Sequence, residues 1–119
     1  MNLPHLAPML FAKEVLELKK KEVLVKCSFP YVPSLAMLCE AAAQSSAAFL
    51  NEEKDKPEIG FLINIKNVLE LKVLKECECI VKVIKNVELE NMSEYDFEVI
   101  FNNRIYSKGT LTVVIPSKI

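Results

Sequence analysis

The stretch SLAMLCEAAAQSSAAFL, residues 34–50, decides the fold that we predict for this chain. It is rich in alanine and leucine and contains no β-branched residue, which is the composition of a strong helix former. Pro33 precedes it, Ser34 is a candidate N-cap, and the polar run 51–57 ends it. Because almost every side of this helix is uncharged, we expect it to be surrounded by protein.

The segments on both sides of this helix have the composition of β-strands. Several alternate apolar with charged residues, which is the period of a half-buried strand. Asn102-Asn103 fits a tight hairpin before the last of them. The strands that we expect cover residues 9–18, 23–27, 59–73, 77–83, 95–101 and 105–115. These patterns predict an α+β fold, with an antiparallel sheet wrapped around one long central helix.

Length and composition bound the class of protein. A chain of 119 residues with 51% hydrophobic and 26% charged residues is typical of one globular domain, and we expect residues 1–119 to form it. The net charge of −1 and interleaved charges of both signs give no reason to expect a nucleic-acid partner. No secretory signal is recognised, and no stretch approaches the length of a membrane span.

The cysteines and glycines exclude several kinds of site. Cys27, Cys39, Cys77 and Cys79 lack zinc-ligand spacing, so we expect buried free thiols in a reducing cytoplasm and no metal site. The two glycines of the chain form no phosphate-binding loop. We therefore expect a cytoplasmic protein that needs no cofactor.

Glu40 is the candidate for chemistry, because it is the one charged residue between Val32 and Asn51. A carboxylate in an apolar helix is costly unless it is paired or protonated. Gln44 lies one turn further along the same face, where its amide can orient the carboxylate. A second interpretation stays open, in which Glu40 lies at a helix edge or a subunit interface and contacts water or a lysine.

The start of the helix is a second candidate. The backbone N–H groups after Ser34 have no partner within the helix and lie at the positive end of its dipole. They are placed to polarise a carbonyl group. A thioester carbonyl docked there would bring its α-carbon near the turn that carries Glu40.

Four short motifs in order resemble one known family over nearly the whole chain. The motifs are LPHLAP at 3–8, Phe29-Pro30 with EAAAQ at 40–44, GFLINIKN at 60–67, and GTLT at 109–112. They resemble the hot-dog fold 3-hydroxyacyl-(acyl-carrier-protein) dehydratases of the FabA/FabZ type, with the ApeP-like group as the nearest relatives. The resemblance implies a hot-dog fold and a role on acyl thioesters in fatty-acid or polyene-type lipid biosynthesis.

One departure from this family concerns the base. Its members carry a histidine before the Phe-Pro dipeptide that removes the α-proton, and Ser28 stands there in this chain, or Lys26 in a shifted alignment. His5 matches the opening motif, which the family does not use as the base. The resemblance implies Glu40 as the catalytic acid/base. It leaves Ser28, Tyr31, Ser34 and Gln44 as substrate-binding candidates, with Lys26, Ser28 and Tyr31 open as replacements for the histidine.

Taken with these residues, the resemblance implies three candidate functions. The first is a dehydratase subunit that dimerises, with itself or with a histidine-bearing hot-dog protein, and acts on a thioester of acyl-carrier protein. The second is a thioesterase for acyl-CoA or acyl-carrier protein, in which Glu40 and the helix start suffice. The third is a non-catalytic acyl-binding protein. All three predict a dimer, because a monomer would expose a sheet edge.

Overall fold

The computed structural model describes residues 10–51 and 61–114, and its elements follow the predicted order. Two strands precede the helix and four follow it. The elements are β1 (Ala12–Leu18), β2 (Glu22–Ser28), α1 (Leu35–Asn51), β3 (Phe61–Glu70), β4 (Glu78–Leu89), β5 (Met92–Phe101) and β6 (Arg104–Val114). The predicted boundaries of the helix differ from these by one residue at each end.

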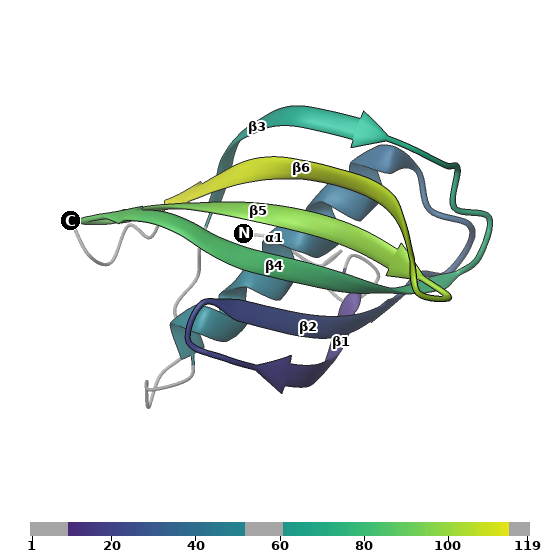
Figure 1. Ribbon diagram of the computed structural model, residues 1–119, viewed down its shortest axis with the longest axis horizontal. Helices are drawn as coiled ribbons and strands as arrows, with labels where there is room; N and C mark the ends of the chain where they lie inside the picture. The colour runs from purple at the N-terminus through teal and green to yellow at the C-terminus, as the bar shows by residue number, and fades with distance from the viewer. Residues whose placement is uncertain (1–9, 52–60, 115–119) are drawn as a thin grey trace, which may run out of the picture.

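All six strands belong to one antiparallel sheet in the order β1-β2-β4-β5-β6-β3. Figure 1 shows that β3, which follows the helix in the chain, runs along the opposite edge of the sheet from β1. It pairs there with β6, from Phe61↔Val114 to Glu70↔Ser107. The sheet is therefore closed to further strands everywhere except at β1 and β3.

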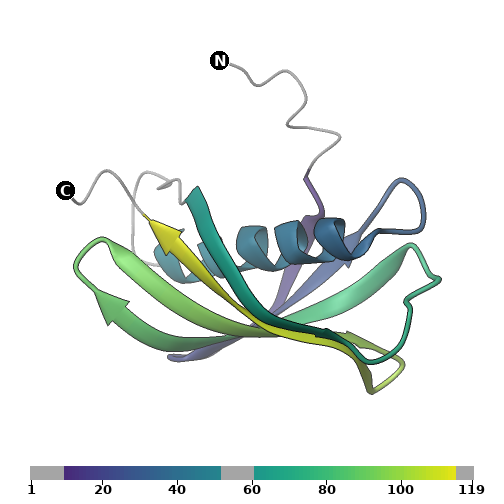
Figure 2. The ribbon, with the colours of Figure 1, turned by 90° about the horizontal axis from the view of Figure 1, so that it is seen from above.

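The helix lies on the concave face of the curved sheet, as Figure 2 shows from above. Alternate residues of the central strands point toward it and form the core, whereas their neighbours point to the outer, convex face. The inward residues of β2, β4 and β5 include Val23, Val25, Cys27, Cys79, Val81, Val83, Tyr95, Phe97 and Val99. The predicted wrapping of a sheet around one helix is confirmed.

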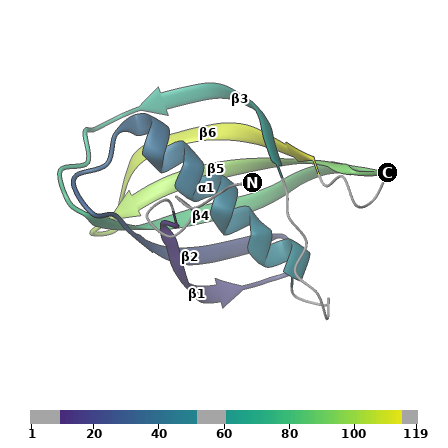
Figure 3. The ribbon, with the colours of Figure 1, turned by 180° about the vertical axis from the view of Figure 1, so that it is seen from behind.

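The side of α1 that meets the sheet is built largely from small residues. Leu38, Ala41 and Ala42 are fully buried, and the hydroxyl groups of Ser45 and Ser46 donate to helix carbonyls at 2.7 and 2.6 Å. Short side chains let the strands approach the helix axis closely. The opposite side of the helix, which faces the viewer in Figure 3, carries half-buried and exposed residues. The described residues therefore enclose the helix on the sheet side only, and the expectation that protein surrounds it is not met within them.

Two details of the strands concern individual residues. Asn102 and Asn103 have φ angles of 54° and 64°, the left-handed conformation that a two-residue hairpin turn requires, which confirms the predicted turn. Cys77 is exposed and precedes β4, so the expectation that all four thiols are buried is wrong for this one. The strand alternation begins at Glu78, one residue too late to bury Cys77.

Candidate functional site

Glu40 lies on the side of α1 that faces away from the sheet, and it is half-buried. Among the described residues, no cation lies within ion-pair distance of its carboxylate. Nε2 of Gln44 donates a hydrogen bond to Oε2 of Glu40 at 3.4 Å, the contact that the spacing of four residues predicts. The carboxylate is therefore held by a neutral donor rather than by a charge.

The oxygen of the Gln44 side chain is occupied by the backbone at the start of β1. The N–H of Phe11 donates to Oε1 of Gln44 at 2.7 Å, and the N–H of Ala12 donates to the same atom at 3.1 Å. Two N–H donors can face only the oxygen end of an amide, so its NH2 group is directed toward Glu40. The sequence gives no signal for this contact, because these donors lie 32 and 33 residues from Gln44 in the chain.

A small cavity of about 140 Å³ lies beside Gln44, between β1 and α1. Gln44 forms part of its wall, together with Ala47 and Ala48 of the helix and Ala12 and Lys13 of β1. The alanines leave this space because their side chains end at Cβ. The cavity thus has room for a small group beside the Gln44 side chain, and Glu40 is not part of its wall.

The start of the helix has the predicted cap. Oγ of Ser34 accepts the N–H of Met37 at 3.2 Å, and the Ser34 carbonyl accepts the N–H of Leu38 at 3.1 Å. The N–H groups of Leu35 and Ala36 make no hydrogen bond within the described residues. Ser34 precedes Glu40 by six residues, which corresponds to about 9 Å along a helix axis. The capping role of Ser34 is confirmed, and a substrate role for it stays a prediction.

The candidates from β2 and the following loop lie elsewhere in the structure. Lys26 is exposed on the outer face of the sheet, because its neighbours Val25 and Cys27 point toward the helix. Ser28 ends β2, and its N–H donates to the Phe11 carbonyl at 2.9 Å. Tyr31 is 63% exposed. No hydrogen bond joins these residues to Glu40, and Lys26 lies on the wrong side of the sheet to act with Glu40 of the same chain.

The buried thiols are poor nucleophiles. Burial raises the pKa of Cys27 to about 11, and the pKa of Cys79 to about 12, from the ordinary value of 9.0. Thiols with such values are protonated near neutral pH and pack as small apolar groups. In the part of the chain that the structure describes, no group of three His, Cys, Asp or Glu residues could hold a metal ion. His5 lies outside the described residues.

Comparison with known proteins shows the fold and no more. No family model matches the chain, and no curated protein sequence matches it. Solved structures do match. One is a chain of the dehydratase heterocomplex ApeI:P from Xenorhabdus doucetiae, with a TM-score of 0.78, 16% identity, and coverage of 96% of this chain and 88% of that one.

Two further matches come from proteins with a bound coenzyme. A hypothetical thioesterase from Streptococcus pneumoniae TIGR4 with coenzyme A has a TM-score of 0.66 and 15% identity, and the match covers 86% of this chain and 84% of that one. The protein smu.793 from Streptococcus mutans UA159, bound to acetyl-CoA, has a TM-score of 0.67 and 12% identity, with 86% of each chain covered. The architecture and these matches establish a hot-dog fold. Among the described residues, no helix is long and apolar enough to cross a membrane.

Proposed function

We propose that this hot-dog protein is an acyl-thioester-binding subunit of the FabZ/ApeP-like dehydratase type, in which Glu40 supplies the carboxyl group and a partner chain supplies the histidine. The observation that carries the proposal is the Glu40–Gln44 pair, a half-buried carboxylate held by an amide whose orientation the backbone fixes. No histidine lies among the described residues, and the family that the chain resembles does not use the position of His5 as its base, so we assign the base to a partner chain.

The chemistry needs two groups on one substrate. The partner's histidine removes the proton from C2 of a 3-hydroxyacyl thioester, and protonated Glu40 gives its proton to the departing 3-hydroxyl group. The carbon–oxygen bond breaks, water leaves, and a trans-2-enoyl thioester remains. Each group must reach within about 3 Å of its substrate atom. The thioester is carried by acyl-carrier protein or coenzyme A.

The exposed edge of the sheet supports assembly with a second hot-dog chain. β3 pairs with β6 on one side only, and its exposed residues Ile63 and Leu69 have 54% and 49% of their surface accessible. An apolar strand with an unpaired edge tends to acquire a partner strand. The heterocomplex among the structural matches is consistent with a mixed pair. We expect light scattering to give the mass of a dimer; a monomer at every concentration would contradict this assembly.

A complementation assay tests the proposed role of Glu40. The chain is purified together with a histidine-bearing hot-dog dehydratase subunit whose own catalytic carboxylate has been removed, and 3-hydroxyacyl-carrier protein is followed by mass spectrometry. We expect the mixture to remove one water per substrate, and Glu40→Gln to abolish this loss. Glu17→Gln is the matched control, since Glu17 is an exposed carboxylate of β1. An equally active Glu40→Gln mixture would refute the proposal.

Hydrolysis of an acyl thioester is the second candidate, and the start of α1 favours it. The N–H groups of Leu35 and Ala36 are without acceptors in the described part of the chain, and they lie at the positive end of the helix dipole. Such donors stabilise the oxyanion that forms when water attacks a thioester carbonyl. Glu40 would act as the general base for that water. The coenzyme-bound structural matches are consistent with this chemistry.

Release of free thiol distinguishes the two functions. The purified chain alone is incubated with short- and medium-chain acyl-CoA, and the thiol is titrated. Hydrolysis that is lost in Glu40→Gln would establish the thioesterase. An intact thioester here, together with no water loss in the mixed assay, would leave a non-catalytic acyl-binding protein as the remaining function. We expect the protein to work in the cytoplasm, where its free thiols stay reduced.

A further inference from the structure

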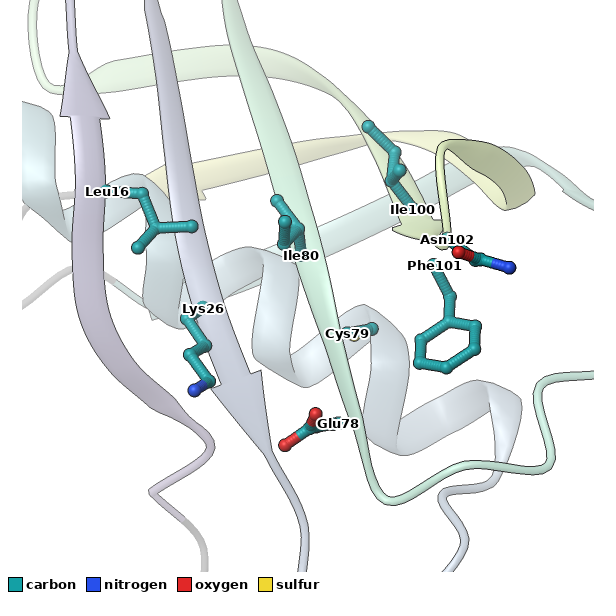
Figure 4. A pocket seen from close by; sticks show the side chains of 8 residues that line it. All are labelled: Leu16, Lys26, Glu78, Cys79, Ile80, Ile100, Phe101 and Asn102. Atoms are coloured by element: carbon teal, nitrogen blue, oxygen red, sulfur yellow. The ribbon is translucent and has the colours of Figure 1, made fainter.

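A second cavity, of about 330 Å³, opens on the outer face of the sheet, on the far side from the helix. Figure 4 shows it with the strands in front and the helix behind. Its lining comes from four strands and the β5–β6 turn, and it consists of Leu16, Lys26, Glu78, Cys79, Ile80, Ile100, Phe101 and Asn102. Its volume lies in the range of ordinary ligand sites. We call this cavity the outer groove.

The floor of the outer groove is a local apolar strip. Ile80 and Ile100 are paired directly across β4 and β5, and both point outward. Leu16 extends the apolar strip at the β1 end. The pairing of β1 with β2 shifts register between Val15 and Glu17, so Leu16 is an extra residue whose side chain lies on this face. It remains 45% exposed.

Beyond the outer groove, the outward residues of the sheet include the apolar Leu24 and Ile84 together with two polar pairs. Lys82 and Glu22 form an ion pair at 3.1 Å, and the hydroxyl of Thr110 donates to Asp96 at 2.8 Å. A surface for a second protein would continue the apolar strip over a larger area. Lys82 lies between Ile80 and Ile84 on the outward side of β4, and its ion pair interrupts the apolar strip there, so the groove fits a small ligand rather than a subunit.

The rim of the outer groove carries one charge of each sign. Lys26 is paired with Ile80 in the β2–β4 ladder and Glu78 with Ser28, so the two charged residues are diagonal neighbours, about 7–8 Å apart at Cα. Neither has an ion-pair partner among the described residues. Asn102, held by its left-handed φ in the hairpin turn, adds an amide at the other end.

These features select the head group of a ligand. A carboxylate would be attracted by Lys26 and repelled by Glu78. An ammonium group would be attracted by Glu78 and repelled by Lys26. An uncharged group that both donates and accepts hydrogen bonds can satisfy Lys26 and Glu78 together. We propose that the outer groove binds an aliphatic chain with an uncharged, hydrogen-bonding head such as a glycerol ester or an amide.

The test uses the full chain and three probes of matched alkyl length: 1-decanoylglycerol, decanoate and decylammonium, each below its micellar concentration. Backbone amide shifts are followed by NMR. We expect saturable shifts confined to β1, β2, β4, β5 and the turn at Asn102. The glycerol ester should bind about tenfold more tightly than either charged probe, the factor that one well-made hydrogen bond supplies. Equal affinity for all three probes, or no saturable shift, would overturn the proposal.

Variants locate the binding. Leu16→Ser should weaken all three probes several-fold, whereas Leu89→Ser, an exposed leucine at the far end of β4, should not. Lys26→Gln should shift the preference toward decylammonium, and Glu78→Gln toward decanoate. Unchanged preferences in both charge variants would refute the assignment of the rim. Glu40 does not line the outer groove, so Glu40→Gln should bind the probes with the affinity of the unmodified chain. Loss of probe binding would therefore contradict the outer-groove proposal alone, and loss of the Glu40-dependent reaction would contradict the proposed function alone.

Discussion

Two substitutions of Gln44 test its two hydrogen-bonding roles separately: the side chain accepts from the β1 backbone and donates to Glu40. Leucine at this position removes the acceptor of the Phe11 and Ala12 N–H groups and also the donor to Glu40. Phe11 is 1% exposed, so its unsatisfied N–H costs about 1–3 kcal/mol, whereas the N–H of half-buried Ala12 reaches water at a cost of about 0.5–1 kcal/mol. We expect Gln44→Leu to lose about 1.5–4 kcal/mol of unfolding free energy.

Glutamate at the same position keeps the acceptor and removes only the donor. Gln44→Glu still accepts both N–H groups, but it places a carboxylate where Nε2 lies 3.4 Å from Oε2 of Glu40. Two like charges at this separation repel by about 1 kcal/mol in a water-like dielectric. Replacing Glu40 by glutamine in the same chain removes the repulsion. We therefore expect Gln44→Glu to lose about 1 kcal/mol of unfolding free energy at neutral pH, and we expect no such loss when Glu40→Gln is already present.

Urea unfolding at about pH 7 of the unmodified chain, Gln44→Leu, Gln44→Glu, Glu40→Gln and the double variant Glu40→Gln/Gln44→Glu measures both effects, because the midpoint shifts in proportion to the lost free energy. Two results would refute the reasoning. One is a Gln44→Leu variant that unfolds at the urea concentration of the unmodified chain, which would mean that the backbone donors need no acceptor. The other is a Gln44→Glu deficit that is equally large in the Glu40→Gln chain, which would mean that Glu40 is not its neighbour.

Three more perturbations test the fold around the site. Ser34→Ala should cost about 1 kcal/mol by removing the cap of α1, and Ser34→Asp should keep it; equal thermal midpoints for all three proteins would contradict the cap. Gly109→Ala should cost about 1–3 kcal/mol, because a Cβ there would lie 2.9 Å from the Phe97 ring, and an alanine variant with a higher melting temperature would disprove the close contact. The raised pKa values of Cys27 and Cys79 favour the protonated thiols in the folded state, so their contribution is fully present below about pH 9 and is lost as the pH rises toward 11–12. Unfolding free energies at about pH 8 and about pH 10.5 should show this decline, and Cys79→Val should reduce it; an identical decline in that variant would place its cause elsewhere.

The sequence predicted the features that depend on local periodicity. Alanine-rich composition located the helix to within one residue at each end, and the spacing of four residues brought Gln44 to Glu40. The alternation of β4 and β5 correctly separated inward from outward residues. These predictions hold because they need only the geometry of one helix or one strand.

Features that depend on pairing between distant segments could not be predicted from the sequence. The bond from Phe11 to Gln44 joins residues 33 positions apart, and no local pattern marks either of them. Lys26 was an open candidate for the missing base until the register of β2 placed it on the outer face. The outer groove depends on an extra residue in β1, and the alternation of apolar and charged residues does not predict that extra residue.

The strand order also bears on how the chain is made. β3 has no hydrogen-bonding partner until β6, the last strand, has been synthesised. At about 5–20 residues per second, the ribosome takes several seconds to cover that interval, and during it the apolar residues of β3 are exposed. A nascent chain of this fold is therefore most vulnerable to aggregation in the period before its final strand appears. A nonsense mutation within β6 would prolong that state indefinitely, and it should yield insoluble protein even though the helix, Glu40 and Gln44 have all been synthesised.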